Sequence, residues 1–87
     1  MKREQIKSLY SIIDQILWSD WDPIGINDDP EARDEYQNYL PQVYGLKIKN
    51  ADQETIANYL FKIETENMGL IGDFEKCRRV AYKILIA

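Results

Sequence analysis

The chain has 87 residues, enough for one domain and too few for two, so we expect residues 1–87 to form a single helical domain. Its only cysteine, Cys77, excludes a disulfide framework and favours a reducing compartment, while the net charge of −4 at pH 7 disfavours binding to nucleic acid. The start, MKREQIKSLYSII, lacks the apolar segment of a signal peptide, and no apolar run reaches the ~20 residues that span a bilayer. We therefore expect a cytoplasmic protein without membrane contact.

Residues 3–18 are predicted to form the first helix. Apolar side chains recur there at helical spacing, the pattern of a helix with one face on a core. These residues are Ile6, Leu9, Tyr10, Ile13, Ile16 and Leu17.

Residues 19–29 follow as a loop that is longer than the usual connection between helices, so we expect it to be packed rather than loose. Trp21 and Ile24 are its predicted anchors. Pro23 and Gly25 are residue types that fix a turn.

The sequence Asp29-Pro30-Glu31 predicts the start of a second helix, with Asp29 as its cap and Pro30 in its first turn. Pro41 removes an amide from this helix, so we expect a kink or break there and an end between Gly45 and Lys49. The apolar stripe of the second helix comprises Ala32, Tyr36, Tyr39, Leu40 and Val43.

Two further helices are predicted, capped by Asp52 and Asp73. Asn67-Met68-Gly69 should end the third, because glycine readily takes the left-handed conformation after a helix. Cys77 falls on the inner face of the fourth, where we expect a small buried hydrophobe. The apolar run 81–87 either closes the bundle or contributes to a homo-oligomer. The fold class expected is all-α, a four-helix bundle with a long packed loop between helices 1 and 2.

Several short pieces resemble a small bacterial family of all-helical proteins, common in Bacillus and classed as a domain of unknown function. The pieces are Trp21-Asp22-Pro23-Ile24-Gly25, Asp34-Glu35-Tyr36, Tyr39-Leu40-Pro41, Tyr59-Leu60 and the pattern IExExMGL from Ile63 to Leu70. They are also similar to small proteins encoded beside secreted toxins, for which an immunity role is proposed. The resemblance implies a helical fold and no established activity or cofactor. Gly45 departs from the family pattern, which has Leu or Arg nearby.

The loop and its flanks hold the strongest functional signal. Seven of the fifteen acids lie between Asp20 and Glu35 with one base, Arg33, so this stretch carries −6 and the rest of the chain +2. Such a charge distribution suits electrostatic steering toward a basic protein partner, and it also suits a merely solvated acidic loop. The predicted partner-binding residues are Trp18, Asp20, Asp22, Asp28, Asp29, Asp34, Glu35 and Tyr39.

Structural roles are predicted for Asp22, Tyr36 and Glu64. Asp22 can accept amides from the turn after Pro23. Glu64 lies at the edge of the core stripe of the third helix, where a carboxylate needs hydrogen-bond partners. Our hypothesis is that Glu64 or Tyr36 hydrogen-bonds the backbone of residues 21–27.

A calcium loop is the sharpest alternative. Counting from Asp20, a twelve-residue loop has Asp20, Asp22 and Asp28 at positions 1, 3 and 9, with Gly25 at position 6 and Glu31 at position 12. Position 5 is Ile24, which has no side-chain oxygen, and position 8 is Asn27, where an apolar residue is usual. A metal- or small-ligand-binding domain using this loop therefore remains the second hypothesis, and we assign no metal ligand and no cofactor.

An enzyme is not expected, and no catalytic residue is assigned. The chain has no histidine, no glycine-rich phosphate loop and no G-x-S-x-G motif. Zinc lacks its usual nitrogen and sulfur ligands. The basic residues Lys76, Arg78, Arg79 and Lys83 of the fourth helix are interpreted as a solvated face. The expected function is a non-enzymatic protein-binding module, in concrete form an immunity-type inhibitor of a basic partner.

Overall fold

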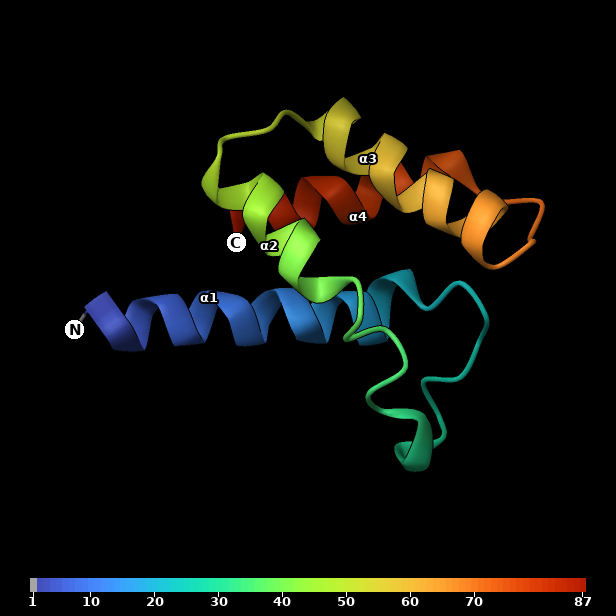
Figure 1. Cartoon of the computed structure of the whole chain (residues 1–87), viewed down its shortest axis with the longest axis horizontal. Helices are drawn as coiled ribbons and strands as arrows, with labels where there is room; N and C mark the ends of the chain where they lie inside the picture. The colour runs from blue at the N-terminus through green and yellow to red at the C-terminus, as the bar shows by residue number, and fades with distance from the viewer. Residues whose placement is uncertain (1) are drawn as a thin grey trace.

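Four α-helices make up the architecture, and they are α1 (Lys2–Ile16), α2 (Leu40–Ile48), α3 (Gln53–Lys62) and α4 (Phe74–Ile86). The computed structural model describes the backbone of residues 2–87 and the side chains from Leu9 onward (Figure 1). The helices α3 and α4 lie side by side and antiparallel, and α1 lies below them and contacts both α2 and α4. The predicted fold class, an all-α bundle of four helices with a loop region between the first two, is confirmed.

The first helix passes directly into a π-helical turn, η1 (Leu17–Trp21). This wider turn buries Leu17, Trp18 and Trp21 together and ends at Asp22, whose backbone is left-handed with φ of +32°. On the predicted apolar face, Ile6 lies outside the residues whose side chains are described. Tyr10 proves exposed, with its ring edge-on against Tyr44 at 5.1 Å between centroids.

The prediction of one long second helix is wrong in its first half. Asp29 caps only a three-residue 3₁₀ turn, η2 (Pro30–Ala32), and successive turns then carry the chain to Tyr39. The helix α2 begins at Leu40, with Pro41 in its first turn. Proline has no amide to donate and a fixed φ, so it suits the start of a helix better than the interior. Pro41 therefore starts α2 instead of kinking a longer helix.

The caps predicted for α3 and α4 are confirmed. The Asp52 carboxylate accepts the Thr55 amide at 2.8 Å, and the Asp73 carboxylate accepts the Lys76 amide at 3.1 Å. α3 continues as a second π-helical turn, η3 (Ile63–Asn67), which buries both Ile63 and Glu64. Gly69 follows with φ of +68°, as its predicted place after the helix requires.

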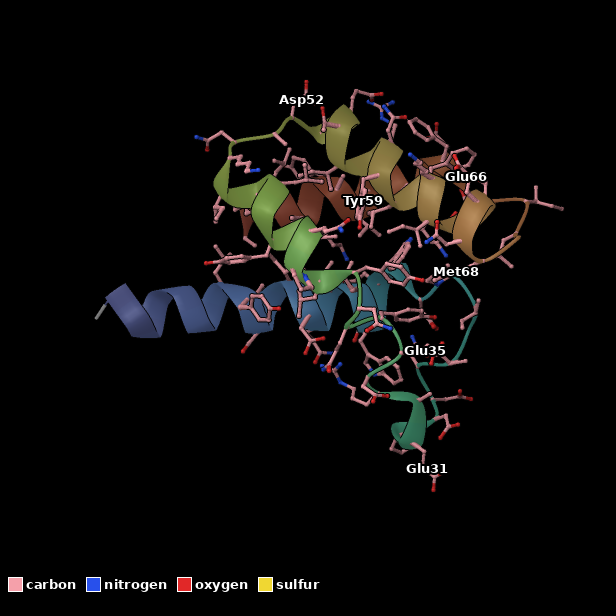
Figure 2. The ribbon with its side chains drawn as sticks, viewed as in Figure 1. Glu31, Glu35, Asp52, Tyr59, Glu66 and Met68 are labelled. Carbon is pink, nitrogen blue, oxygen red and sulfur yellow. The ribbon has the colours of Figure 1, made fainter. Side chains whose placement is uncertain are left out.

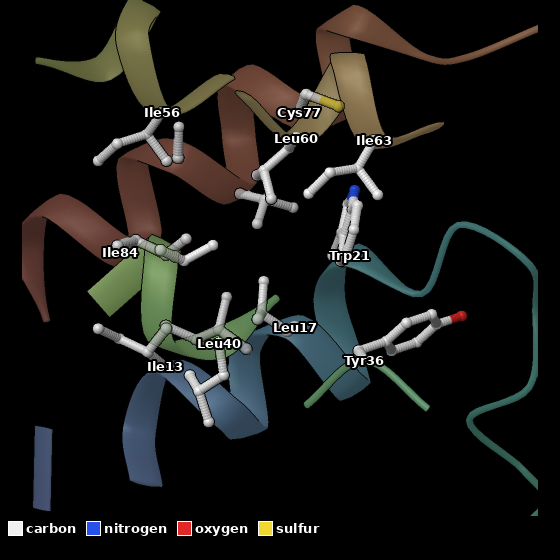
Figure 3. Close-up of a cluster of buried hydrophobic side chains, with 14 of the residues drawn as sticks. Ile13, Leu17, Trp21, Tyr36, Leu40, Ile56, Leu60, Ile63, Cys77 and Ile84 are labelled. Carbon is white, nitrogen blue, oxygen red and sulfur yellow. The ribbon is translucent and has the colours of Figure 1, made fainter. Parts of the chain in front are cut away.

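A single hydrophobic core joins the helices (Figure 3). Trp21 extends from η1 toward Ile63 and Cys77, and thereby connects the end of α1 with α3 and α4. Among the described residues, no helix is both long and apolar enough to cross a membrane. The fully buried apolar side chains include Ile13, Leu17, Trp21, Val43, Ile56, Leu60, Cys77 and Ile84.

The C-terminal run 81–87 closes the bundle. Ala81 and Ile84 are buried in the core, whereas Tyr82 and Ile86 are exposed. A homo-oligomer formed through this run stays a prediction.

Gly72, in the turn before α4, has φ of +89°, and a Cβ added there would lie 2.6 Å from Phe61 Cε1 and 2.9 Å from Thr65 Cγ2. We expect Gly72→Ala to lower the free energy of unfolding by about 2 kcal/mol or more, because strain and overlap add. Gly45→Ala is the matched control. Gly45 lies within α2 with no such neighbour within 4 Å, so alanine should raise stability by ~0.5–1 kcal/mol. Urea unfolding of both variants tests this, and a Gly72→Ala protein as stable as the parent would contradict it.

Candidate functional site

Glu64 is the one charged residue that is buried among the described side chains, with 1% of its surface exposed. Its Oε2 accepts the indole Nε1–H of Trp21 at 2.8 Å and the thiol of Cys77 at 3.3 Å. Its Oε1 accepts the backbone amide of Asp73 at 2.8 Å. A buried carboxylate is tolerated only when hydrogen-bonded, and these three donors supply that need.

These bonds join η3 to the end of η1 and to the start of α4. Trp21 ends η1, Asp73 caps α4, and Cys77 lies on the first full turn of α4. The Glu64 carbonyl also accepts the Leu70 amide at 2.8 Å, which fixes the turn after η3. The position of Trp21, and with it the point where the chain leaves the bundle, is therefore set by Glu64.

Cys77 is buried, as predicted, but it is also a hydrogen-bond donor. Burial, reinforced by the neighbouring Glu64 carboxylate, raises the pKa of the Cys77 thiol to about 12. Its thiol therefore stays protonated at neutral pH. A nucleophile or metal ligand needs the thiolate and access to solvent, and Cys77 has neither.

A second cluster of hydrogen bonds shapes the segment after Trp21. The Tyr36 hydroxyl donates to Asp22 Oδ1 at 2.7 Å and accepts the Ile24 amide at 3.3 Å. Asp22 also accepts the amides of Ile26 at 2.8 Å and Asn27 at 3.3 Å. Burial and the bond to Asp22 raise the pKa of Tyr36 well above its ordinary value, so the hydroxyl remains a donor.

The hypothesis about the loop backbone is confirmed for Tyr36, which accepts the Ile24 amide. Glu64 instead holds the loop through the side chain of Trp21.

Of the predicted apolar anchors, Trp21 is fully buried and Ile24 is not. Ile24 is 41% exposed, so its assignment as an anchor is wrong, and Ile26 packs against the core in its place. The left-handed turn at Asp22 and the bend after it account for this exchange. Pro23 lies in that turn, and Gly25 takes the positive φ of +67° that glycine accommodates without strain.

Residues 27–35 form an acidic lobe that extends beyond α1, on the side opposite α3 and α4 (Figure 1). Glu31 lies at its tip and points outward, and Glu35 lies closer to the bundle (Figure 2). All the acids of the lobe are exposed, namely Asp28, Asp29, Glu31, Asp34 and Glu35.

The one base of the lobe is occupied by contacts inside the molecule. Arg33 forms a bidentate ion pair with Asp14 of α1, with nitrogen–oxygen distances of 3.1 and 2.9 Å. Its guanidinium also lies over the ring of Trp18, 5.3 Å from the centroid. Arg33 thus ties the lobe to α1, and its guanidinium pairs with Asp14 and with none of the five exposed carboxylates among the described ion pairs.

Four of the predicted partner-binding residues make contacts within the molecule. Trp18 is only 8% exposed and lies beneath Arg33, and Tyr39 is half-buried, with its ring edge-on to Trp21 at 6.0 Å. Neither can serve as an exposed anchor. The Asp22 carboxylate is consumed by the bonds to Tyr36 and the turn, and Asp20 pairs with Lys83 of α4 at 3.2 Å.

The calcium-loop alternative gains no support from the geometry. Asp22 binds amides and a hydroxyl, while Asp20 faces Lys83. Within the part of the chain that is described, no three acidic or cysteine side chains come together in an arrangement that could hold a metal ion.

No protein-family model, curated protein or solved structure matches this chain. The resemblance to the Bacillus family therefore stays a prediction.

Alkaline pH should destabilise the fold partly through Cys77. The thiol pKa is 9.0 ordinarily and about 12 in the folded state, so below pH 9 both states are protonated and stability is unaffected. As pH rises from 9 toward 12, only the unfolded state loses this proton, and folding stability falls. We expect the free energy of unfolding of Cys77→Ala to fall less steeply than that of the parent over this range. Parallel slopes in urea titrations at pH 8, 9 and 10 would contradict this.

Proposed function

We propose that this chain is a non-enzymatic protein-binding module whose acidic lobe contacts a basic surface of a partner protein. The observation that carries the proposal is the exposure of five carboxylates on one lobe whose single base is engaged with Asp14 and Trp18. Uncompensated charge of one sign on a projecting surface accelerates encounter with a partner of the opposite sign and selects against others.

The shape of the lobe favours a macromolecular partner over a small ligand. Its five carboxylates are exposed to solvent, and only Asp28 lines the neighbouring hollow of about 280 Å³. This hollow offers room for one side chain of a partner. Its lining comprises Trp18, Asn27, Asp28, Pro30 and Arg33.

Binding without catalysis is supported by the state of the two buried reactive groups. The Glu64 carboxylate has its oxygens occupied by three donors, and the Cys77 thiol is buried and protonated. Neither group is presented to a substrate.

The concrete form that we propose is an immunity-type inhibitor, which covers a basic surface of a toxin. An inhibitor of this kind needs a rigid, charged contact surface and no chemistry of its own. The lobe meets this description because hydrogen bonds of Tyr36, Asp22 and Trp21 fix the segment that connects the lobe to the bundle.

Neutralising three lobe acids should weaken partner capture. In the variant D28N/D34N/E35Q, the cap at Asp29 is left intact because its carboxylate accepts the Glu31 amide. The immobilised parent protein should first capture a basic partner at low salt. We expect that partner to bind the variant about tenfold more weakly than it binds the parent. Quantitative mass spectrometry of the bound fraction, with biolayer interferometry on the purified partner, measures this change.

The matched control is N58K/E66K, which raises the net charge by the same three units at exposed residues outside the lobe. It should retain the partner. A partner that binds both variants equally, or that resists about 0.5 M NaCl, would count against steering by the lobe.

A further inference from the structure

A second charged surface lies on α4, separate from the lobe. It surrounds a hollow of about 420 Å³ beside the start of α3. We call this surface the basic face. Its lining comprises Gln53, Glu75, Arg78, Arg79, Tyr82 and Lys83, with three cations to one acid.

The cations of the basic face are only loosely engaged. Arg78 pairs with Glu54 at 3.0 Å and Lys83 with Asp20 at 3.2 Å, and the side chains of both pairs are between about a third and about half exposed. Ion pairs this exposed exchange readily with competing carboxylates. Arg79 is exposed and has no ion-pair partner among the described side chains. The face can therefore accept carboxylates from outside.

The acidic lobe carries the complementary charge and cannot reach this face within its own chain. The lobe extends on the opposite side of α1 from α4 (Figure 1). No ion pair among the described side chains joins residues 27–35 to α4. Residues 27–35 have five acids and one base, whereas α4 has four bases and one acid.

We propose that the basic face binds the acidic lobe of a second copy of this chain, head to tail. Arg78 and Arg79 receive carboxylates of the lobe, and Tyr82, which is 54% exposed, contributes apolar area beside them. Two such contacts form a symmetric dimer if the second copy can bind its own lobe to the basic face of the first. Otherwise, repeated contacts form an open-ended assembly. A copy bound in this way has its lobe covered, so self-association competes with binding of the basic partner. This competition rests on the function proposed above.

The salt dependence of association distinguishes this contact from general attraction. Copies with a net charge of −4 repel one another, and lowering the salt strengthens that repulsion. Association that increases at low salt therefore requires local complementarity that outweighs the net charge.

The first test is sedimentation velocity of the whole chain at about 20 mM and 500 mM NaCl, over a range of protein concentrations. We expect a concentration-dependent increase in mass at low salt that is lost at high salt. R78E/R79E should remain monomeric at both salt concentrations. The matched control K49E/K62E makes the same charge change at exposed lysines elsewhere, and it should associate like the parent. R78Q/R79Q repeats the test with less perturbation should R78E/R79E unfold by circular dichroism. A parent protein that stays monomeric at low salt and millimolar protein concentration overturns the proposal.

The second test is a charge exchange between the two surfaces. D28K/E35K alone should be monomeric, and an equimolar mixture with R78E/R79E should restore a mixed assembly. Failure of the mixture to associate, or self-association of D28K/E35K alone, overturns the proposal. The proposed partner contact is judged separately, because it needs the lobe and not the basic face. R78E/R79E should capture the basic partner at least as well as the parent does.

Discussion

The hydrogen bond from the Trp21 indole to the buried carboxylate of Glu64 determines where the acidic segment leaves the bundle. A charged group in a core is stable only if every oxygen finds a donor, so Glu64 constrains the elements that supply the donors. Trp21, Asp73 and Cys77 must each keep their positions for the carboxylate to be satisfied. The end of α1 and the start of α4 are thereby fixed to η3 by one side chain.

From that fixed point the chain is shaped by a second constraint, the bond between Tyr36 and Asp22. It closes the segment on itself, and the pair of Arg33 with Asp14 attaches the outer part of the lobe to α1. Together these contacts leave the five acids of the lobe exposed to solvent. The polar atoms of Asp22, Tyr36 and the turn bond one another within the lobe's support. The same sequence thus supplies a rigid support and a charged surface, which is the basis for both proposed interactions.

Local chemistry made part of this predictable from the sequence. Asp52, Asp73 and Gly69 were recognisable because capping and left-handed turns depend on only a few neighbouring residues. The second helix was misjudged because Pro41 and the cap at Asp29 are compatible with either one kinked helix or a turn followed by a helix. The difference lies in where Tyr36 packs, and that is a tertiary contact.

The site was predictable only in outline. Asp22 could be assigned to the loop because it precedes the turn residue Pro23, and Tyr36 because it offers a hydroxyl for hydrogen bonding. Glu64 stood out at the edge of an apolar stripe. The burial of Trp18 under Arg33 and the replacement of Ile24 by Ile26 had no local signal, since a left-handed residue at Asp22 redirects every side chain after it.

The central claim is that the lobe is held rigidly through Glu64, and backbone ¹⁵N relaxation measures this most directly. In the parent, the order parameters of residues 22–39 should match those of α3 and α4, at about 0.85. Glu64→Gln leaves one acceptor oxygen for three donors, so these values should fall across residues 22–39 while the helices keep theirs, and Glu66→Gln, at an exposed position, should change neither. Values below about 0.6 for the lobe of the parent, or no change in Glu64→Gln, would contradict the account.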